Sequence, residues 1–175
     1  TPFSSLSDEV AQNSITMIAP TKTFNIASMN IGISIIPNER LRRRFEHSRE
    51  RVVKNGNVFG LVALKAAYNR SESWLEEQLD YLEKNKEYAV EFIREEIPKV
   101  GVVEPEGTFL LWIDFNELGL KEEELDELIL NEAKVALDNG AWFGDNGEGF
   151  MRLNFAGLKE TLEEGLERIR KAVEV

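Results

Sequence analysis

The chain has 175 residues, of which 42% are hydrophobic, and this is enough apolar material for a core in one domain or in two small ones. Its formal net charge of −11 argues against nucleic acid or an anionic membrane as a partner, because both would repel it at long range. The absence of cysteine excludes disulfides, thiolate metal sites and thiol nucleophiles, and it is compatible with a reducing cytoplasm.

The single histidine, His47, narrows the chemistry further. One histidine argues against a histidine-based metal site and against a Ser-His-Asp arrangement. Its charged neighbours, among them Arg44 and Glu50, are typical of a polar helix face. No apolar run is long enough to cross a bilayer, and there is no signal-peptide pattern. We therefore expect neither a metal nor a membrane as a partner.

The first fourteen residues predict a loop and a short helix, which Ser7 or Asp8 can cap ahead of Val10. The chain opens with threonine instead of an initiator methionine and soon reaches a strand pattern. Such a start is compatible with a processed domain and equally with the second half of a longer protein.

Two apolar runs, residues 15–18 and 31–36, then predict two buried strands joined by a loop that Pro20 begins. Lys22 lies in this loop. Enzymes of the α/β class often place reactive groups at the ends of buried strands, where side chains reach a crevice while the sheet holds the backbone. Lys22 is therefore the first candidate for catalysis, and the alternative is an ordinary solvated surface lysine.

A helix capped by Asn38 is predicted to run to about Val53, with its apolar face formed by Leu41, Phe45 and Val52. Residues 55–57 (NGN) break it. Residues 58–68 are apolar on most faces, which predicts a helix buried between layers.

The longest periodic segment, residues 73–97, predicts an amphipathic helix with a capping box formed by Ser73 and Glu76. Its apolar stripe is Leu75, Leu79, Leu82, Ala89 and Ile93. A long helix of this kind often links two domains, so we place a domain boundary near residue 70. Pro98 helps to end the helix.

The remaining pattern is two strands joined by a four-residue turn, then a helix, a short strand, a glycine-rich loop, a strand and a closing helix. In order, these elements are residues 100–103, 108–115, 121–133, 135–137, 138–149, 150–156 and 158–173. The alternation predicts an α/β fold. No phosphate-binding glycine motif of the nucleotide-binding types is present.

Arg152 is the second candidate. In the strand FMRLNFA it shares one face with Phe150 and Asn154, and Met151, Leu153 and Phe155 share the other. A half-buried guanidinium needs an anionic partner, and arginine can bind a carboxylate through two hydrogen bonds. Arg152 is thus either a clamp for a substrate carboxylate or a solvated strand residue.

The glycine-rich loop before Arg152 carries Trp142 and Phe143. Its backbone amides and aromatic rings could line a small-molecule pocket. The alternative is a surface turn in which Trp142 anchors the loop to the core.

Residues 19–27 (APTKTFNIA) closely resemble the cofactor-lysine segment of pyridoxal-phosphate enzymes of the aspartate aminotransferase fold, called fold type I. The likeness is greatest to the cystathionine β-lyase (C–S lyase) group called MalY/PatB. It continues in order along nearly the whole chain, through residues 57–60 (NVFG), 66–68 (AAY), 74–75 (WL), 79–82 (LDYL), 107–109 (GTF), 112–115 (WIDF), 140–144 (GAWFG) and 147–154 (GEGFMRLN).

The resemblance implies roles for three residues. Lys22 corresponds to the lysine that binds pyridoxal 5'-phosphate covalently, Thr21 beside it is a further cofactor contact, and Arg152 corresponds to the arginine that grips the substrate α-carboxylate. Many aminotransferases of this fold have a phosphate-binding arginine where this chain has Asn30, and the C–S lyase group lacks that arginine too. Asn30 therefore favours the lyase group and leaves the phosphate contacts unassigned.

The carboxylate, phosphate donors and stacking ring of such a site come from the first half of these enzymes. The chain thus resembles a C-terminal portion, in which residues 1–70 end the cofactor-binding large domain and residues 71–175 form a linking helix and a small α/β domain. The resemblance implies a homodimer that cleaves the C–S bond of cysteine thioether amino acids, with Lys22 as the base that removes the α-proton. The alternatives are an aminotransferase with the same residues and a non-catalytic fragment or binding module.

Overall fold

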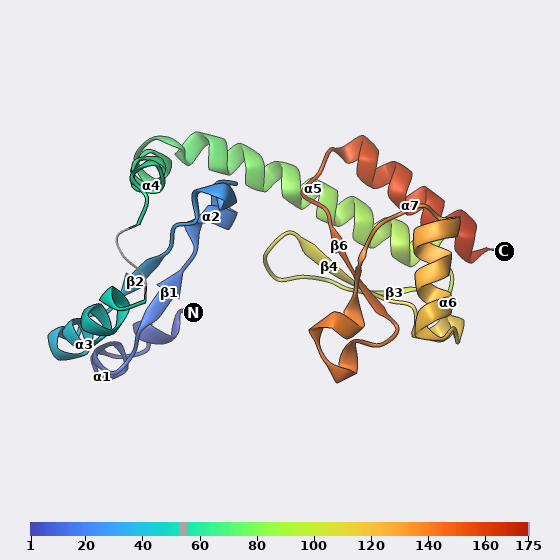
Figure 1. Cartoon of the computed structure of the whole chain (residues 1–175). Coiled ribbons are helices and arrows are strands. Elements are labelled where there is room, and N and C mark those ends of the chain that lie inside the picture. The colour runs from blue at the N-terminus through green and yellow to red at the C-terminus, as the bar shows by residue number, and fades with distance from the viewer. Residues whose placement is uncertain (53–55, 175) are drawn as a thin grey trace. The chain divides into compact units, whose positions relative to one another are not determined.

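The computed structural model describes residues 1–52 and 56–174 (Figure 1). The chain divides into two compact units, Thr1–Glu77 (unit 1) and Gln78–Val175 (unit 2), and each is described by itself. The mixed α/β architecture confirms the predicted fold class. The assignment of residues 1–70 and 71–175 to two domains of a larger enzyme stays a prediction. Among the described residues, no helix combines the length and the apolar composition needed to span a membrane.

Unit 1 is built from short elements around a two-stranded sheet. They are α1 (Asp8–Gln12), β1 (Thr16–Ile18), α2 (Pro20–Thr23), β2 (Ile33–Ile35), α3 (Glu39–Glu50), α4 (Val58–Arg70) and the start of α5 (Glu72–Glu96), with 3-10 turns at Phe3–Ser5 and Ala27–Met29. The side chains of Ser7 and Asn38 accept hydrogen bonds from the first-turn amides of α1 and α3, which confirms both predicted caps. The predicted helix end at Val53 and the break at Asn55 lie outside the described residues.

The prediction that the strands beside Lys22 are buried is wrong for this chain. β1 and β2 pair with each other in an antiparallel ribbon, with Thr16 opposite Ile35 and Ile18 opposite Ile33. Met17 is 65% exposed and Ile35 48%. A two-stranded ribbon has no neighbouring strands or covering layer of its own, so an apolar strand pattern does not by itself produce burial.

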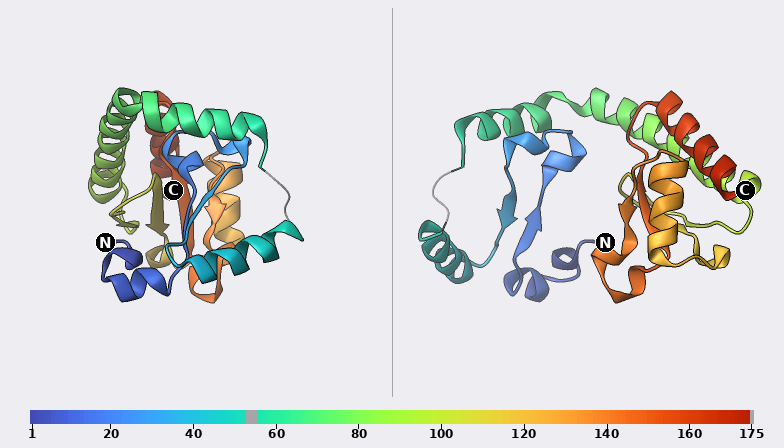
Figure 2. Two further views of the ribbon diagram at one scale, coloured as in Figure 1. Left: turned by 90° about the vertical axis from the view of Figure 1, so that its left-hand side faces the viewer. Right: turned by 45° about the vertical axis from the view of Figure 1, so that its right-hand side comes forward.

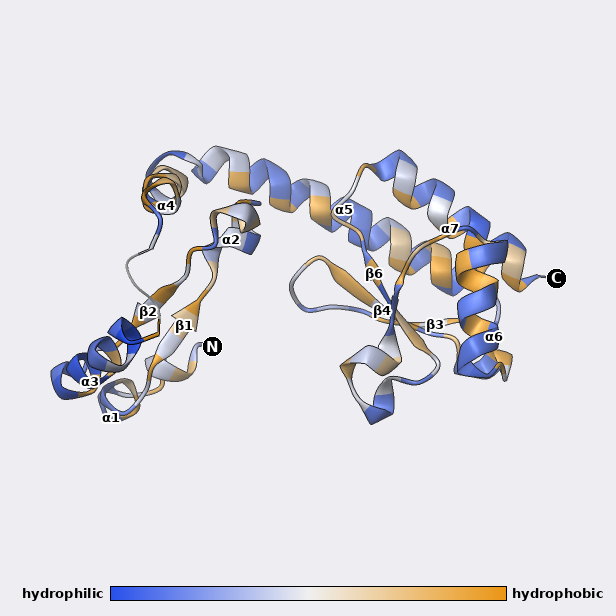
Figure 3. Ribbon diagram, viewed as in Figure 1, coloured by the Kyte–Doolittle hydropathy of each residue, from blue (hydrophilic) through white to orange (hydrophobic). Residues whose placement is uncertain are grey.

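The predicted burial of the helix over residues 58–68 is also wrong. α4 forms as expected, but Phe59 is 80% exposed and Val62 63%, and Gly60 and Ala67 are its buried residues. Figure 3 colours much of α4 as hydrophobic. We call the exposed set Val58, Phe59, Leu61 and Val62 the apolar surface of α4. Val52, predicted to face inward, is likewise exposed.

Unit 2 contains a four-stranded antiparallel sheet in the order β3-β4-β6-β5. Its strands are β3 (Gly101–Val103), β4 (Leu110–Asp114), β5 (Asp138–Asn139) and β6 (Phe150–Asn154), and its helices are the rest of α5, α6 (Glu122–Asp126), which continues as a π-helical segment (Glu127–Glu132), and α7 (Lys159–Val173). Short 3-10 segments lie at Asn116–Leu118, Gly140–Phe143 and Asp145–Gly147. The hairpin of β3 and β4 agrees with the sequence prediction.

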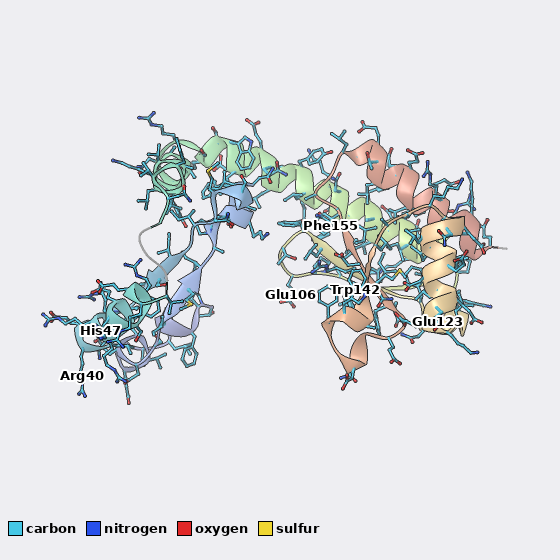
Figure 4. All side chains as sticks on the ribbon, viewed as in Figure 1. Arg40, His47, Glu106, Glu123, Trp142 and Phe155 are labelled. Carbon is cyan, nitrogen blue, oxygen red and sulfur yellow. The ribbon has the colours of Figure 1, made fainter. Side chains whose placement is uncertain are left out.

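One face of this sheet carries the core. Leu111 and Ile113 of β4 and Met151 and Leu153 of β6 are buried, and they pack with apolar residues of α5, α6 and α7 in a single cluster. Figure 2 shows from two sides that these helices flank the sheet. Phe155, just beyond β6, points into the interior (Figure 4). The predicted alternation of β6 is confirmed, so Arg152 lies on the opposite face.

Three further details differ from the sequence prediction. The short strand predicted at residues 135–137 lies instead at Asp138–Asn139, because pairing with β6 defines it and local apolar character does not. Ser73 lies inside α5, which begins at Glu72, so the capping box with Glu76 is not at the helix start. Leu79, assigned to the apolar stripe, is 55% exposed.

The loop between β5 and β6 is held by a close contact of two backbones. Gly140 and Gly147 are both buried, and a Cβ atom added to either would overlap the carbonyl oxygen of the other. Such an approach requires that neither residue has a side chain. This contact fixes the loop that carries Trp142 and Phe143.

We expect Gly147→Ala to destabilise unit 2 by about 1–3 kcal/mol, because the added methyl group forces two backbones apart. The measurement is urea unfolding followed by circular dichroism. Gly165→Ala is the matched control: nothing lies within 4 Å of a Cβ atom at this position in α7, so the better helix propensity of alanine should raise stability by up to about 1 kcal/mol. Equal effects of the two changes would contradict the proposed role of the contact.

Candidate functional site

Lys22 lies on α2, a single turn of helix that comes directly after β1. Pro20 is the first residue of the helix. An N–H at this position would have no partner within the helix, so proline, which lacks one, costs nothing here, and its fixed φ favours the helix. Pro20 and Thr21 are buried, while Lys22 is exposed. The turn is thus anchored by its first two residues and presents the amine of the third.

The segment around Lys22 is nearly free of charge. Between Glu9 and Glu39, Lys22 is the only ionisable side chain. The segment therefore contributes neither a carboxylate that could neutralise the ammonium nor an arginine that could bind a phosphate.

Two asparagines shape the backbone after Lys22. Asn25 and Asn30 adopt left-handed conformations with φ of 50° and 46°, which asparagine tolerates better than most residues because its side chain can bond locally. The amide of Ile26 donates a hydrogen bond of 2.9 Å to the carbonyl oxygen of Thr21. These features close the chain around Lys22 into a compact turn.

The same turn is attached to α4. The Oδ1 atom of Asn57 accepts a hydrogen bond from the amide of Gly60 at 2.6 Å and so caps α4, and its Nδ2 atom donates to the carbonyl oxygen of Met29 at 2.7 Å. Phe24 packs edge-on against Tyr68, with 5.4 Å between ring centroids. The sequence prediction placed Asn57 in a helix break and in a segment of the family resemblance, and it missed the contact with Met29, which joins residues 28 positions apart.

Arg152 occupies the middle of β6, between two partner strands. Trp112 of β4 is its register partner on one side and Asp138 of β5 is its partner on the other. Side chains at paired positions lie on the same face of a sheet. The sheet therefore places one aromatic and one acidic side chain beside the guanidinium.

Asp138 is the anionic partner that a half-buried arginine requires. One carboxylate oxygen, Oδ2, accepts from Nε of Arg152 at 3.1 Å and from Nη2 at 2.6 Å. The ring of Phe143 lies against the guanidinium, with Cζ 4.5 Å from its centroid. The Arg152 side chain is 32% exposed. It is thus neither freely solvated nor unpaired.

An aromatic row continues from Phe143. Trp112 packs edge-on against Phe143 at 5.6 Å and stacks on Phe150 at 5.7 Å. Trp142 is 73% exposed, so the interpretation of Trp142 as a core anchor is wrong. The loop is held by its glycine contact instead, and Phe143 contacts the candidate site.

The sequence prediction missed Asp138. An opposite charge directly across a strand pair is a recognisable signal, but the short strand was predicted to end one residue before it. His47 lies on α3 (Figure 4), where it is exposed and its Nε2 atom lies 3.2 Å from Nη2 of Arg51. The described residues hold no cluster of three or more His, Cys, Asp or Glu side chains that could bind a metal.

Known proteins with similar sequences and folds are pyridoxal-phosphate enzymes. The chain is 43% identical over 174 residues to the cystathionine beta-lyase PatB of Bacillus subtilis, and the match covers 99% of this chain and 45% of that protein, its C-terminal half. In sequence and fold, the chain matches the C-terminal part of fold-type I enzymes. It spans about 45% of the length of the curated relatives it matches.

Two solved structures support this match. A PLP-bound putative aminotransferase from Clostridium difficile superposes with a TM-score of 0.93 at 45% identity, over 98% of this chain and 45% of that one. Cystalysin from Treponema denticola, which contains pyridoxal 5'-phosphate, superposes with a TM-score of 0.94 at 34% identity, over 99% and 44%. No family model matches the chain. The similarity confirms the predicted fold-type I relationship.

The residues of this chain fit one part of a pyridoxal-phosphate site. The primary amine of Lys22 can bind an aldehyde covalently, and its segment offers no internal carboxylate that would compete for it. The segment lacks the acid that pairs with a pyridinium nitrogen, and it has no cationic phosphate ligand besides Lys22. Thr21 is buried beside Lys22, and its contact with the cofactor stays a prediction.

The role of Asn57 can be tested by separating its two hydrogen bonds. We expect Asn57→Asp to keep the cap on α4, because a carboxylate still accepts from Gly60, and to lose the donor to Met29. Hydrogen exchange should then speed up at the amides of residues 26–30 but not at Gly60. Asn57→Ala should lose both bonds and cost about 1–2 kcal/mol through the cap alone.

Asn38→Ala is the control. It removes the cap of α3, in which the Asn38 side chain accepts from the amide of Leu41, and this cap does not involve residues 26–30. If exchange at residues 26–30 were unchanged in both Asn57 variants, Asn57 would not hold the turn that carries Lys22.

Proposed function

We propose that the chain is the C-terminal part of a pyridoxal-phosphate-dependent C–S β-lyase that acts on cysteine thioether amino acids. The observation that carries this proposal is the 43% identity to cystathionine beta-lyase PatB over 99% of the chain. The isolated amine of Lys22 and the half-buried guanidinium of Arg152 support it, because an aldehyde cofactor and a substrate carboxylate need these two groups.

In this proposal Lys22 has two tasks and Arg152 has one. The Nζ atom of Lys22 anchors the cofactor and, once an amino-acid substrate has taken its place, accepts the proton from the substrate α-carbon. Arg152 binds the substrate carboxylate through two N–H groups and so orients the α-proton. Bound pyridoxal phosphate supplies an electron sink for the charge left at the α-carbon. A thiol then leaves from the β-carbon.

A second candidate is an aminotransferase with the same residues. The similarity to a putative aminotransferase at 45% identity favours it. The two reactions share the removal of the α-proton and differ in the next step. Lyase action eliminates a thiol, whereas transamination returns the proton to a different atom.

We also infer that the full-length enzyme is a homodimer in the cytoplasm. The apolar surface of α4 supports an assembly that covers it. The absence of cysteine is compatible with a reducing compartment.

Borohydride reduction of the full-length holoenzyme should fix the cofactor on the peptide that contains Lys22, as mass spectrometry would detect. Lys22→Ala should abolish this label and slow thiol release by roughly 10²–10⁴-fold, because both the anchor and the base are lost. Lys65, an exposed lysine of α4, provides the control: Lys65→Ala should change neither result. Recovery of the label on a peptide other than that of Lys22 would refute the assignment.

The products distinguish the candidate functions. With L-cystathionine, the full-length protein is expected to release a thiol and pyruvate in equal amounts, measured with a thiol reagent and a coupled dehydrogenase. Conversion of bound pyridoxal phosphate to pyridoxamine phosphate without pyruvate would indicate transamination instead. Cofactor binding without either product would indicate a non-catalytic protein.

A further inference from the structure

We propose that Asp138 is a positioning residue, which holds the guanidinium of Arg152 side-on so that its far edge binds the carboxylate of the amino-acid substrate. The inference rests on the proposed function of Arg152 and adds a residue that the sequence resemblance does not assign.

The contact geometry defines which edge is occupied. Asp138 uses a single oxygen, Oδ2, for both Nε and Nη2 of Arg152. The edge formed by Nη1 and Nη2 is not the one that faces Asp138. A guanidinium can bind carboxylates along either edge, so an acid fixed on the Nε side leaves the other edge for a second carboxylate.

The fold favours this contact. Asp138 and Arg152 are register partners in β5 and β6, so their side chains leave the same face of the sheet at neighbouring positions. Asn139, the next residue of β5, is itself fixed, because its Nδ2 atom donates to Asp126 at 3.0 Å and its Oδ1 accepts from the amide of Ala141 at 2.8 Å. Phe143 lies against the guanidinium as well. Backbone pairing and packing therefore hold the acid in place.

The opposite interpretation is that Asp138 competes with the substrate carboxylate for Arg152. One observation and one general property of arginine favour positioning. The Asp138 side chain is 45% exposed, so water screens its repulsion of a substrate anion. Arginine has a long side chain with many rotamers, and an oriented guanidinium loses less freedom when a ligand binds. We therefore expect the gain from orientation to exceed the screened repulsion.

The test uses the full-length holoenzyme and 3-(methylthio)propionate, a thioether carboxylate without an amine, as a competitive inhibitor. Asp138→Ala should raise its inhibition constant about tenfold, the size of one lost charge-assisted contact. Asp138→Asn, which keeps an oxygen acceptor, should fall between the wild type and the alanine variant. The uncharged amide of the same compound should be unaffected, which separates carboxylate binding from a general loss of structure.

Asp145→Ala is the charge control. It removes an exposed carboxylate from the segment Asp145–Gly147 of the same loop and should leave the inhibition constant unchanged. Tighter or equal binding of the carboxylate to Asp138→Ala would overturn the positioning role. If Arg152→Gln weakens carboxylate binding while Asp138→Ala does not, only the inference on Asp138 fails. If Arg152→Gln has no effect, the proposed role of Arg152 fails, and with it this inference.

Discussion

The pairing of β6 with β4 on one side and β5 on the other determines the surroundings of Arg152. Strand register places Trp112 and Asp138 at neighbouring positions on the same face, so an aromatic and an acidic group flank the guanidinium without help from a flexible loop. The opposite face of these strands carries the apolar cluster of unit 2. A shift of β6 by one residue would bury Arg152 and expose Met151 and Leu153, so the core itself enforces the register.

Lys22 is held by different means. Its strand is exposed and short, and its turn depends on left-handed asparagines, a buried Pro20 and the bond from Asn57 to Met29. Near Lys22, polar side chains hydrogen-bond to backbone groups and hold the chain in place. Arg152 is held instead by the pairing of buried strands. The two candidate residues therefore respond to different kinds of substitution: Lys22 to the loss of individual hydrogen bonds, and Arg152 to changes in strand pairing.

Sequence patterns predicted most of the elements because helix periods, caps and the alternation of β6 are local properties. Ser7, Asn38 and the closing helix illustrate this. Burial in unit 1 could not be predicted, since apolar composition does not reveal whether a neighbour covers a strand or a helix. Asp138 was missed because a two-residue strand has no period of its own and exists through its pairing with β6. The roles of Lys22 and Arg152 came from resemblance, since position alone left both open.

The apolar surface of α4 links stability to mass action. Phe59 and Val62 are exposed to water in this chain, so the free energy of burying them does not contribute to the stability of unit 1. Anything that covers this surface only in the native state shifts the folding equilibrium of unit 1 by an amount that depends on its own concentration and affinity. The melting temperature of the chain therefore depends on which partners are present and at what concentration. A partner that covers this surface would raise the melting temperature without changing any contact within unit 1.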